Sequence, residues 1–154
     1  MKPGSFTQLY IQVVFSPKAK QSLLKKEFRP ELFRVMGGIL SNMKHTPIII
    51  NGVEDHIHIF FGLNPNVSIS DTVRDLKRAT SLLINEKNWL PNKFSWQEGY
   101  GAFSYSKSHI ENVKNYIANQ EEHHKKKTFK EEYIEFLDKH EVEYDKRFLF
   151  EFYN

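Results

Sequence analysis

Two β-rich runs, Thr46–Ile50 and Val53–Phe61, flank the dipeptide Asn51-Gly52. Asn-Gly between two such runs is the strongest short-range signal for a two-residue β-hairpin turn. We therefore expect a turn at Asn51-Gly52 and two neighbouring strands in an antiparallel sheet.

The remaining elements follow from hydrophobic periodicity and from helix-start signals. A capping serine at Ser70 and a capping box that begins at Ser108 each predict the start of a helix. The other predicted elements are strand Phe6–Phe15, helix Pro30–Lys44, helix Ser70–Trp89, strand Ala102–Ser106, a helix from Ser108 to about Lys126, and helix Thr128–Lys139. The first six elements follow the split βαβ pattern, which predicts an α+β, ferredoxin-like sandwich: an antiparallel sheet with helices on one face. That fold hosts many unrelated functions, so it does not decide the function.

The length of 154 residues is typical of one domain, and no internal repeat or linker divides the chain. No apolar run approaches the ~20 residues of a membrane span, and the first residues lack a secretory signal pattern. We therefore expect a cytoplasmic protein. The absence of cysteine excludes disulfides and thiolate metal sites, so a bound metal would need histidine, carboxylate, amide or water ligands.

The net charge of +3 is unevenly distributed along the chain. Residues 131–154 carry three basic and eight acidic side chains, a net charge of −5, which leaves +8 on residues 1–130. We therefore divide the chain into a basic body, 1–130, and an acidic and aromatic C-terminal extension of the same domain, 131–154. A basic body is typical of a protein that binds a polyanion, although two differently solvated surfaces would give the same asymmetry.

Candidate metal ligands lie in the second β-rich run. Side chains alternate across a strand, so Ile57 and Ile59 would face the core while His56 and His58 share the opposite face. Two neutral imidazoles at this spacing form a two-point anchor for a divalent metal. A pair of surface or hydrogen-bonded histidines is the alternative, and the motif alone does not decide between them.

A second pair lies on the helix predicted after Ser108. Tyr116 and Gln120 are one helical turn apart, so a phenol and an amide oxygen project from the same side. The phenol would suit a nucleophile and the amide oxygen a third metal ligand. The alternative is a half-buried aromatic side chain that flanks the apolar stripe of the helix.

Taken together and in this order, the two pairs resemble a known family. His56 and His58 on a strand, followed by Tyr-Ile-x-Asn-Gln-x-x-His-His from Tyr116 to His124, resemble the single-tyrosine HUH transposases of small bacterial insertion sequences, the IS200-like family. The runs Tyr10–Ser16 and Trp96–Ser106 are also similar to that family, and the match covers most of residues 6–127.

The resemblance implies an enzyme that cuts and rejoins single-stranded DNA beside hairpins at the ends of an insertion element. It implies Tyr116 on a mobile catalytic helix as the nucleophile, through a 5′-phosphotyrosine, with His56, His58 and Gln120 as ligands of one divalent metal. Mg²⁺ or Mn²⁺ is expected, no nucleotide cofactor, and a homodimer, which in this family typically has composite sites with the tyrosine and the histidines from different subunits.

Basic side chains on two helices are candidates for DNA contacts. These candidates are Arg74, Lys77, Arg78, His123 and Lys127. For His123 a plain surface histidine is the alternative, and for Lys127 a lysine that favours a helix C-terminus.

Other functions fit the same motifs. A domesticated palindrome-processing enzyme, or a replication or relaxase-type HUH nickase, would share the chemistry and differ in its target. A non-catalytic module that binds single-stranded nucleic acid would bind without a metal and without a covalent product, and a metallohydrolase would leave Tyr116 without a role.

Overall fold

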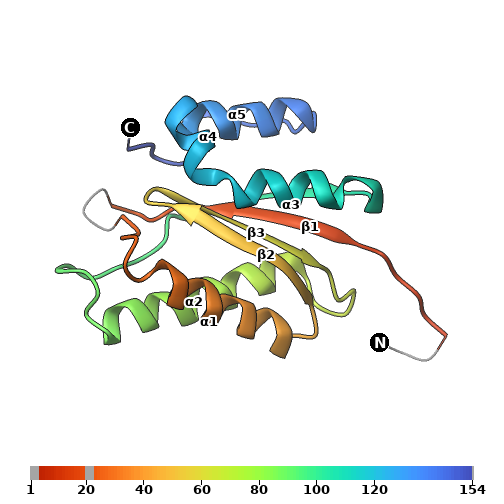
Figure 1. The fold of residues 1–154 in the computed structure, drawn as a ribbon, viewed down its shortest axis with the longest axis horizontal. Helices are drawn as coiled ribbons and strands as arrows, with labels where there is room; N and C mark the ends of the chain where they lie inside the picture. Colours follow the sequence, from red (N-terminus) through yellow and green to blue (C-terminus); the bar gives the residue numbers. More distant parts are fainter. Residues whose placement is uncertain (1–3, 20–22, 154) are drawn as a thin grey trace.

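A four-stranded antiparallel sheet forms the centre of the molecule (Figure 1). This computed structural model describes residues 4–19 and 23–153. The strand order is β2-β3-β1-β4, with β3 and β1 in the middle. The strands are β1 (Tyr10–Phe15), β2 (Thr46–Val53), β3 (His56–Gly62) and β4 (Gly101–Tyr105). The predicted α+β architecture and its antiparallel sheet are confirmed.

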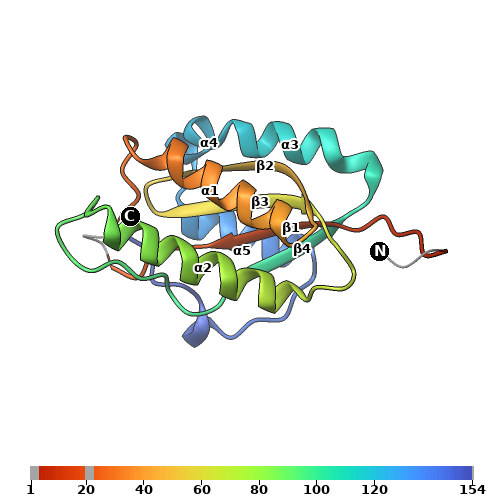
Figure 2. The same ribbon diagram turned by 90° about the horizontal axis from the view of Figure 1, so that it is seen from below.

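Helices cover both faces of this sheet. The split βαβ helices α1 (Arg29–Asn42) and α2 (Ile69–Glu86) share one face, as expected, and α3 (Ile110–Ala118), α4 (Gln120–Lys126) and α5 (Phe129–Lys139) lie over the other (Figures 1 and 2). Two short 3₁₀ helices, η2 (Lys107–His109) and η3 (Lys146–Phe148), lie in the connections. The prediction of helices on one face therefore holds for α1 and α2 only, because the C-terminal helices bury the second face.

The side chains of β3 alternate between these two layers. Ile57 and Ile59 are fully buried in the main core, which α1 and α2 complete. Phe60 belongs to a smaller apolar cluster with Val113 and Ile117 of α3. Because both faces are covered, six of the seven β3 residues are buried, and the polar side chains among them need polar partners.

The hairpin turn lies three residues beyond the predicted position. Asn51 and Gly52 belong to β2 and pair with β3, and the chain turns at Glu54-Asp55. A Cβ on Gly52 would come within 2.5 Å of the His56 carbonyl oxygen, so the close approach of the strands requires glycine there. Asn51 Nδ2 instead donates to the Ile117 carbonyl oxygen at 2.9 Å and ties α3 to the sheet.

The single helix predicted from Ser108 to Lys126 is divided in the structure. Ser108 lies inside η2, and the chain breaks again at Asn119, which separates α3 from α4. The N-cap of α2 likewise is Ser68, whose Oγ accepts from Asp71 N at 3.0 Å, and not Ser70. Ser68 is the residue with the extended backbone that a cap requires, because α2 begins at Ile69.

The C-terminal segment packs onto the rest of the domain. The boundary drawn at residues 130 and 131 falls inside α5, and Phe150 beyond it is buried against Phe129 and Tyr133. Gln97 fixes this return, since its Oε1 accepts from Glu151 N at 2.7 Å and its Nε2 donates to Glu151 O at 2.8 Å. Among the described residues, no helix has the length and apolar character to cross a membrane.

Candidate active site

His56 and His58 lie on the sheet face that α3, α4 and α5 cover. Their side chains are buried, and their rings are 5.1 Å apart between centroids. Each Nδ1 has a fixed partner: Asp55 Oδ1 lies 2.7 Å from His56 Nδ1, and Gln12 Oε1 lies 2.6 Å from His58 Nδ1. An acceptor on Nδ1 holds a proton there, so each imidazole becomes a neutral ligand with a free Nε2 lone pair when a metal displaces the Nε2 proton.

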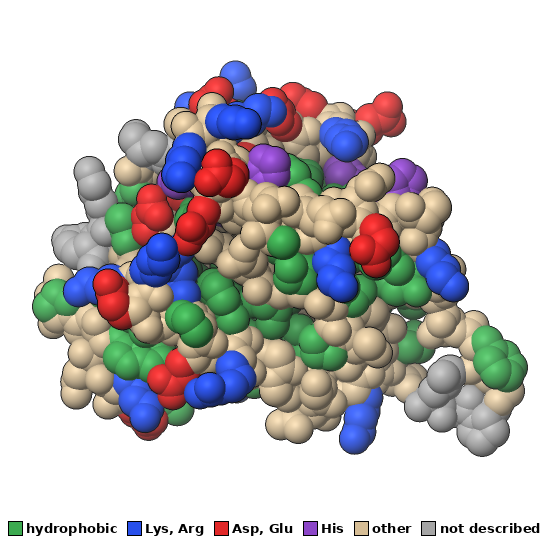
Figure 3. Space-filling model, viewed as in Figure 1, with side chains coloured by type: hydrophobic (Ala, Val, Ile, Leu, Met, Phe, Trp, Pro, Cys, Tyr) green, Lys and Arg blue, Asp and Glu red, His purple; other side chains and the backbone are tan. Residues whose placement is uncertain are grey.

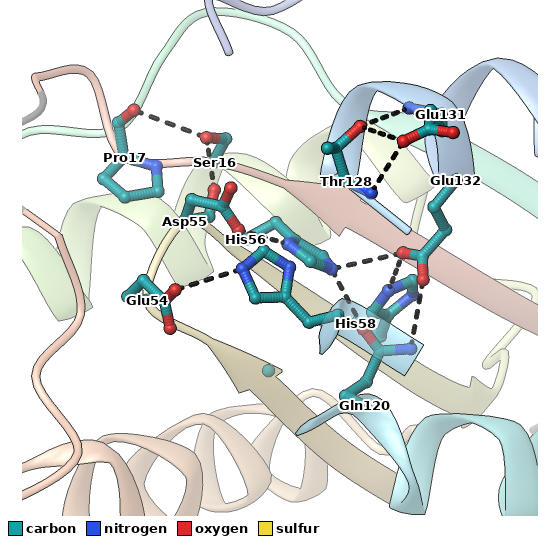
Figure 4. A network of polar contacts seen from close by, with 12 residues as sticks. Ser16, Pro17, Glu54, Asp55, His56, His58, Gln120, Thr128, Glu131 and Glu132 are labelled. Atoms are coloured by element: carbon teal, nitrogen blue, oxygen red, sulfur yellow. Dashed lines mark hydrogen bonds and ion pairs between the residues drawn. The ribbon is translucent and has the colours of Figure 1, made fainter. Parts of the chain in front are cut away.

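The two Nε2 atoms converge on the carboxylate of Glu132, which α5 supplies (Figure 4). Glu132 Oε1 lies 3.1 Å from His56 Nε2 and 2.9 Å from His58 Nε2. The Glu132 side chain is almost completely buried. A carboxylate is costly to bury unless it is paired and hydrogen-bonded, and here the two imidazoles meet that need.

Tyr116 and Gln120 also contact the cluster formed by Glu132 and the two histidines. Tyr116 donates its hydroxyl proton to Glu132 Oε2, and Gln120 Oε1 lies 2.9 Å from His56 Nε2. The Tyr116 ring lies edge-on to His58, with centroids 6.2 Å apart. The structure thus brings His56, His58, Tyr116 and Gln120 together within one chain, although Tyr116 and Gln120 lie on different helices.

Charge and burial control the protonation of these groups. Burial lowers the pKa of His56, but its hydrogen bonds to Asp55 and Glu132 outweigh burial and raise it to about 9. Burial lowers the pKa of His58. Burial and the negative charge of Glu132 raise the pKa of the Tyr116 phenol, so the phenol stays protonated and needs a nearby cation to become a nucleophile.

A cavity of about 300 Å³ adjoins Tyr116 and Glu132. Its polar lining includes Gln12, Lys139 and His109, and its apolar wall includes Phe136. His123 stacks on the Tyr116 ring, with the two ring centroids 4.3 Å apart. A group that enters this cavity meets the phenol and the carboxylate together.

The predicted DNA-contact residues lie in different places. The α2 residues Arg74, Lys77 and Arg78 are on the sheet face opposite Tyr116 (Figures 1 and 2). Lys77 is half-buried, because its Nζ donates to the carbonyl oxygens of Gln97 at 2.7 Å and Gly99 at 2.6 Å. Arg74 pairs with Asp71 and Asp75.

Only part of the set lies on the Tyr116 side of the sheet. His123 stacks on the phenol ring, and Lys127 Nζ pairs with Glu135. Figure 3 shows Lys and Arg side chains interspersed with Asp and Glu side chains over this view of the molecule. Glu135 belongs to residues 131–154, so the acidic extension pairs directly with a basic side chain of residues 1–130.

Three contacting residues had no role in the sequence interpretation. Glu132 had been counted only as one charge of the acidic extension, and Gln12 only as part of the run Tyr10–Ser16. Asp55 adjoins the histidine motif but carried no assignment. The available signal for Glu132 was its helical spacing, since it lies three residues after Phe129 and four before Phe136 on the apolar stripe of α5.

Comparisons with solved structures agree with this fold. A candidate transposase from Deinococcus radiodurans R1 superposes with a TM-score of 0.61 at 20% sequence identity, covering 78% of this chain and 96% of that chain. A REP-associated tyrosine transposase bound to a REP hairpin superposes with a TM-score of 0.59 at 12% identity, covering 80% of this chain and 74% of that chain.

Comparisons of sequence give the family. A search of curated proteins finds no match. The profile of the family described as "Transposase IS200 like" matches residues 5–120, which span β1 to the first residue of α4 and include both histidines, Tyr116 and Gln120. The resemblance noted from the His56/His58 and Tyr116/Gln120 motifs is confirmed, and the chain belongs to the IS200-like transposase family.

Proposed function

We propose that this chain cuts and rejoins single-stranded DNA beside hairpins at the ends of an insertion element. The observation that supports this most is the buried cluster in which the Tyr116 phenol and the His56 and His58 imidazoles share one carboxylate. A non-catalytic binding module has no need for so many buried polar side chains, because their desolvation opposes folding unless each is paired.

Tyr116 is the proposed nucleophile. Its hydroxyl oxygen attacks the scissile phosphorus and the bond from phosphorus to the 3′ oxygen breaks. The departing 3′ oxygen takes up a proton from solvent, and the products are a 5′-phosphotyrosine and a free 3′-OH. The phenol proton leaves along the existing hydrogen bond to Glu132 Oε2. Attack by another 3′-OH on the phosphotyrosine reverses the exchange and joins two strands, so the covalent bond conserves the energy and no nucleotide cofactor is needed.

His56, His58 and Gln120 are the proposed ligands of one Mg²⁺ or Mn²⁺ ion. Their donor set fits, because two imidazole Nε2 atoms and the Gln120 amide oxygen face the same buried point. When bound, the metal stabilises negative charge on the phosphate and on the phenolate. Asp55 and Gln12 hold the imidazoles in the orientation that ligation requires.

The protein is also proposed to recognise a DNA hairpin and to act as a homodimer. The structural neighbour described as bound to a REP hairpin has the same fold, which supports a hairpin as the DNA feature that is recognised. We propose that the protein acts on bacterial DNA in the cytoplasm, as a homodimer in which each subunit holds its own Tyr116 beside its own histidines.

The test is the capture of a covalent protein–DNA complex. The full chain is incubated with Mn²⁺ and single-stranded oligonucleotides that carry hairpins from the DNA flanking its gene, and the products are separated under denaturing conditions. We expect a covalent complex that Tyr116→Phe and a chelator both abolish. Tyr144→Phe, a matched change in the C-terminal segment, should leave it intact. A complex that still forms with Tyr116→Phe contradicts the proposal.

A further inference from the structure

Glu132 differs from the other two glutamates of its helix. Glu131 is exposed and forms the capping box with Thr128 at the start of α5, and Glu135 is exposed and pairs with Lys127. Glu132 alone is only 4% exposed and points into the sheet toward His56 and His58 (Figure 4). Helix capping and surface solvation therefore explain two of these carboxylates and leave the third without a structural reason.

Two aromatic side chains hold Glu132 in place. Phe129 stacks on the His56 ring, with centroids 4.1 Å apart and an interplanar angle of 1°. Phe136 packs against His58, with centroids 5.9 Å apart. Phe129, Glu132 and Phe136 share one face of α5, because they are spaced three and four residues apart. The helix is thus fixed over both imidazoles with its single buried carboxylate between them.

The distances among the donor atoms fit a metal site. Ligands at 2.0–2.1 Å from an octahedral ion are separated by about 2.8–3.0 Å along each edge of the octahedron. Glu132 Oε1 lies 3.1 Å from His56 Nε2 and 2.9 Å from His58 Nε2, and Gln120 Oε1 lies 2.9 Å from His56 Nε2. Each of these separations agrees to within about 0.1 Å with an octahedral edge.

The charge of the site, like the distances, favours a carboxylate among the metal ligands. Two neutral imidazoles and an amide oxygen carry no net charge, and a hard ion such as Mg²⁺ prefers oxygen ligands, among them carboxylates. Glu132 supplies the only carboxylate oxygen that contacts both Nε2 atoms among the residues that the structure describes. Its second oxygen holds the Tyr116 hydroxyl, so one side chain links the metal position to the nucleophile.

We propose that Glu132 Oε1 is a fourth protein ligand of the divalent metal, beside His56 Nε2, His58 Nε2 and Gln120 Oε1. This inference rests on the metal site of the proposed function and adds to it a residue outside the matched segment 5–120. The C-terminal helix is then part of the active site. A protein that ends before α5 would lose a ligand as well as a packing surface.

The test measures binding of Mn²⁺ alone to the full chain, without DNA. Titration calorimetry at fixed pH compares the wild-type protein with Glu132→Gln, which keeps the size and removes the charge, and with Glu135→Gln, the matched control one turn along the same helix. We expect Glu132→Gln to weaken Mn²⁺ binding about tenfold or more, and Glu135→Gln to change it less than about twofold. Glu132→Asp should recover part of the affinity, and circular dichroism checks that each variant is folded.

Other outcomes separate this inference from the proposed function. If Glu132→Gln binds Mn²⁺ as tightly as the wild type or more tightly, Glu132 is a competitor for the histidines rather than a ligand, and the inference is overturned. The proposed metal site would still stand if His58→Ala abolished binding in the same experiment. If the wild type itself does not bind Mn²⁺ and still forms the Tyr116 adduct in a chelator, both metal assignments fail.

Discussion

The two faces of the sheet place neighbouring residues of one strand in opposite environments. On the α1/α2 face, Ile57 and Ile59 enter an apolar core that other apolar side chains of similar volume could fill. On the α3–α5 face, His56 and His58 need specific partners from three other segments, β1, α4 and α5. Packing on the first face depends on hydrophobic pattern and volume, whereas the second face depends on specific hydrogen-bond partners. Substitutions on the first face should therefore lower stability, and substitutions on the second should lower activity.

The largest difference is expected between adjacent residues of β3. His58→Ala should lower the yield of covalent DNA complex by at least about 100-fold, because it removes a proposed ligand. Ile59→Ala should lower the free energy of unfolding by about 2–5 kcal/mol, and the remaining folded protein should stay active. Denaturant unfolding and complex formation are measured on both variants. Equal losses of activity per folded molecule would remove the distinction between the faces.

A smaller effect is expected from the residue that orients His56. Asp55→Asn keeps the shape of the side chain and removes the charge that fixes the Nδ1 proton of His56. Loss of such a partner typically weakens metal binding about 10–100-fold. Mn²⁺ titration of the variant measures this, with Asp71→Asn on the opposite face as the control. Unchanged affinity would show that the orientation of His56 does not depend on Asp55.

The β2–β3 pairing that carries the histidines depends on one glycine. Gly52→Ala would place a methyl group 2.5 Å from the His56 carbonyl oxygen and 2.9 Å from Ile57 Cα, so the two strands must separate. We expect a loss of about 1–3 kcal/mol in unfolding free energy. Gly38→Ala, at a helical position where no atom lies within 4 Å of the added carbon, is the control. A stability equal to wild type for Gly52→Ala would contradict the described strand register.

The smallest effects concern DNA contacts on the two faces. Arg78→Ala on α2 should change DNA affinity little, because α2 covers the face opposite Tyr116. Lys139→Ala, at the cavity beside Tyr116, should weaken DNA binding. It should also reduce the slope of log affinity against log salt concentration by about 1, the value expected for the loss of one phosphate contact. Binding of hairpin DNA measured over a range of salt concentrations tests both. The reverse ranking would place the DNA across α2.

The alternation of residues along β3 predicted the apolar face of the strand. It also predicted the two histidines of the opposite face, but not their partner Glu132. Alternation along β3 correctly assigned Ile57 and Ile59 to one side and both histidines to the other, because a strand's period depends on no distant residue. The prediction of a turn at Asn51-Gly52 was wrong. Gly52 is needed because β2 and β3 approach closely there, and a glycine required for this reason gives the same sequence signal as a glycine in a turn.

Glu132 could not be assigned from charge patterning. In the sequence it is one of eight acidic residues in 131–154, and its burial depends on how α5 crosses the sheet, which is set by contacts with residues 70 or more positions away. The break at Asn119 likewise depends on tertiary packing, because Asn51 binds the carbonyl groups at the end of α3. Helical spacing within α5 was the one local signal that pointed to Glu132.

The most direct test of a complete site within one chain is a subunit-mixing experiment. Tyr116→Phe and His58→Ala proteins are each inactive on this account, and they are mixed under conditions that allow subunits to exchange, with hairpin DNA and Mn²⁺. Wild-type protein mixed with His58→Ala is the control and should form covalent complex. The structure places Tyr116 beside its own His58, so we predict that the mixture of the two variants forms no covalent complex. Recovery of the complex would contradict this and assign the tyrosine and the histidines of each working site to different subunits.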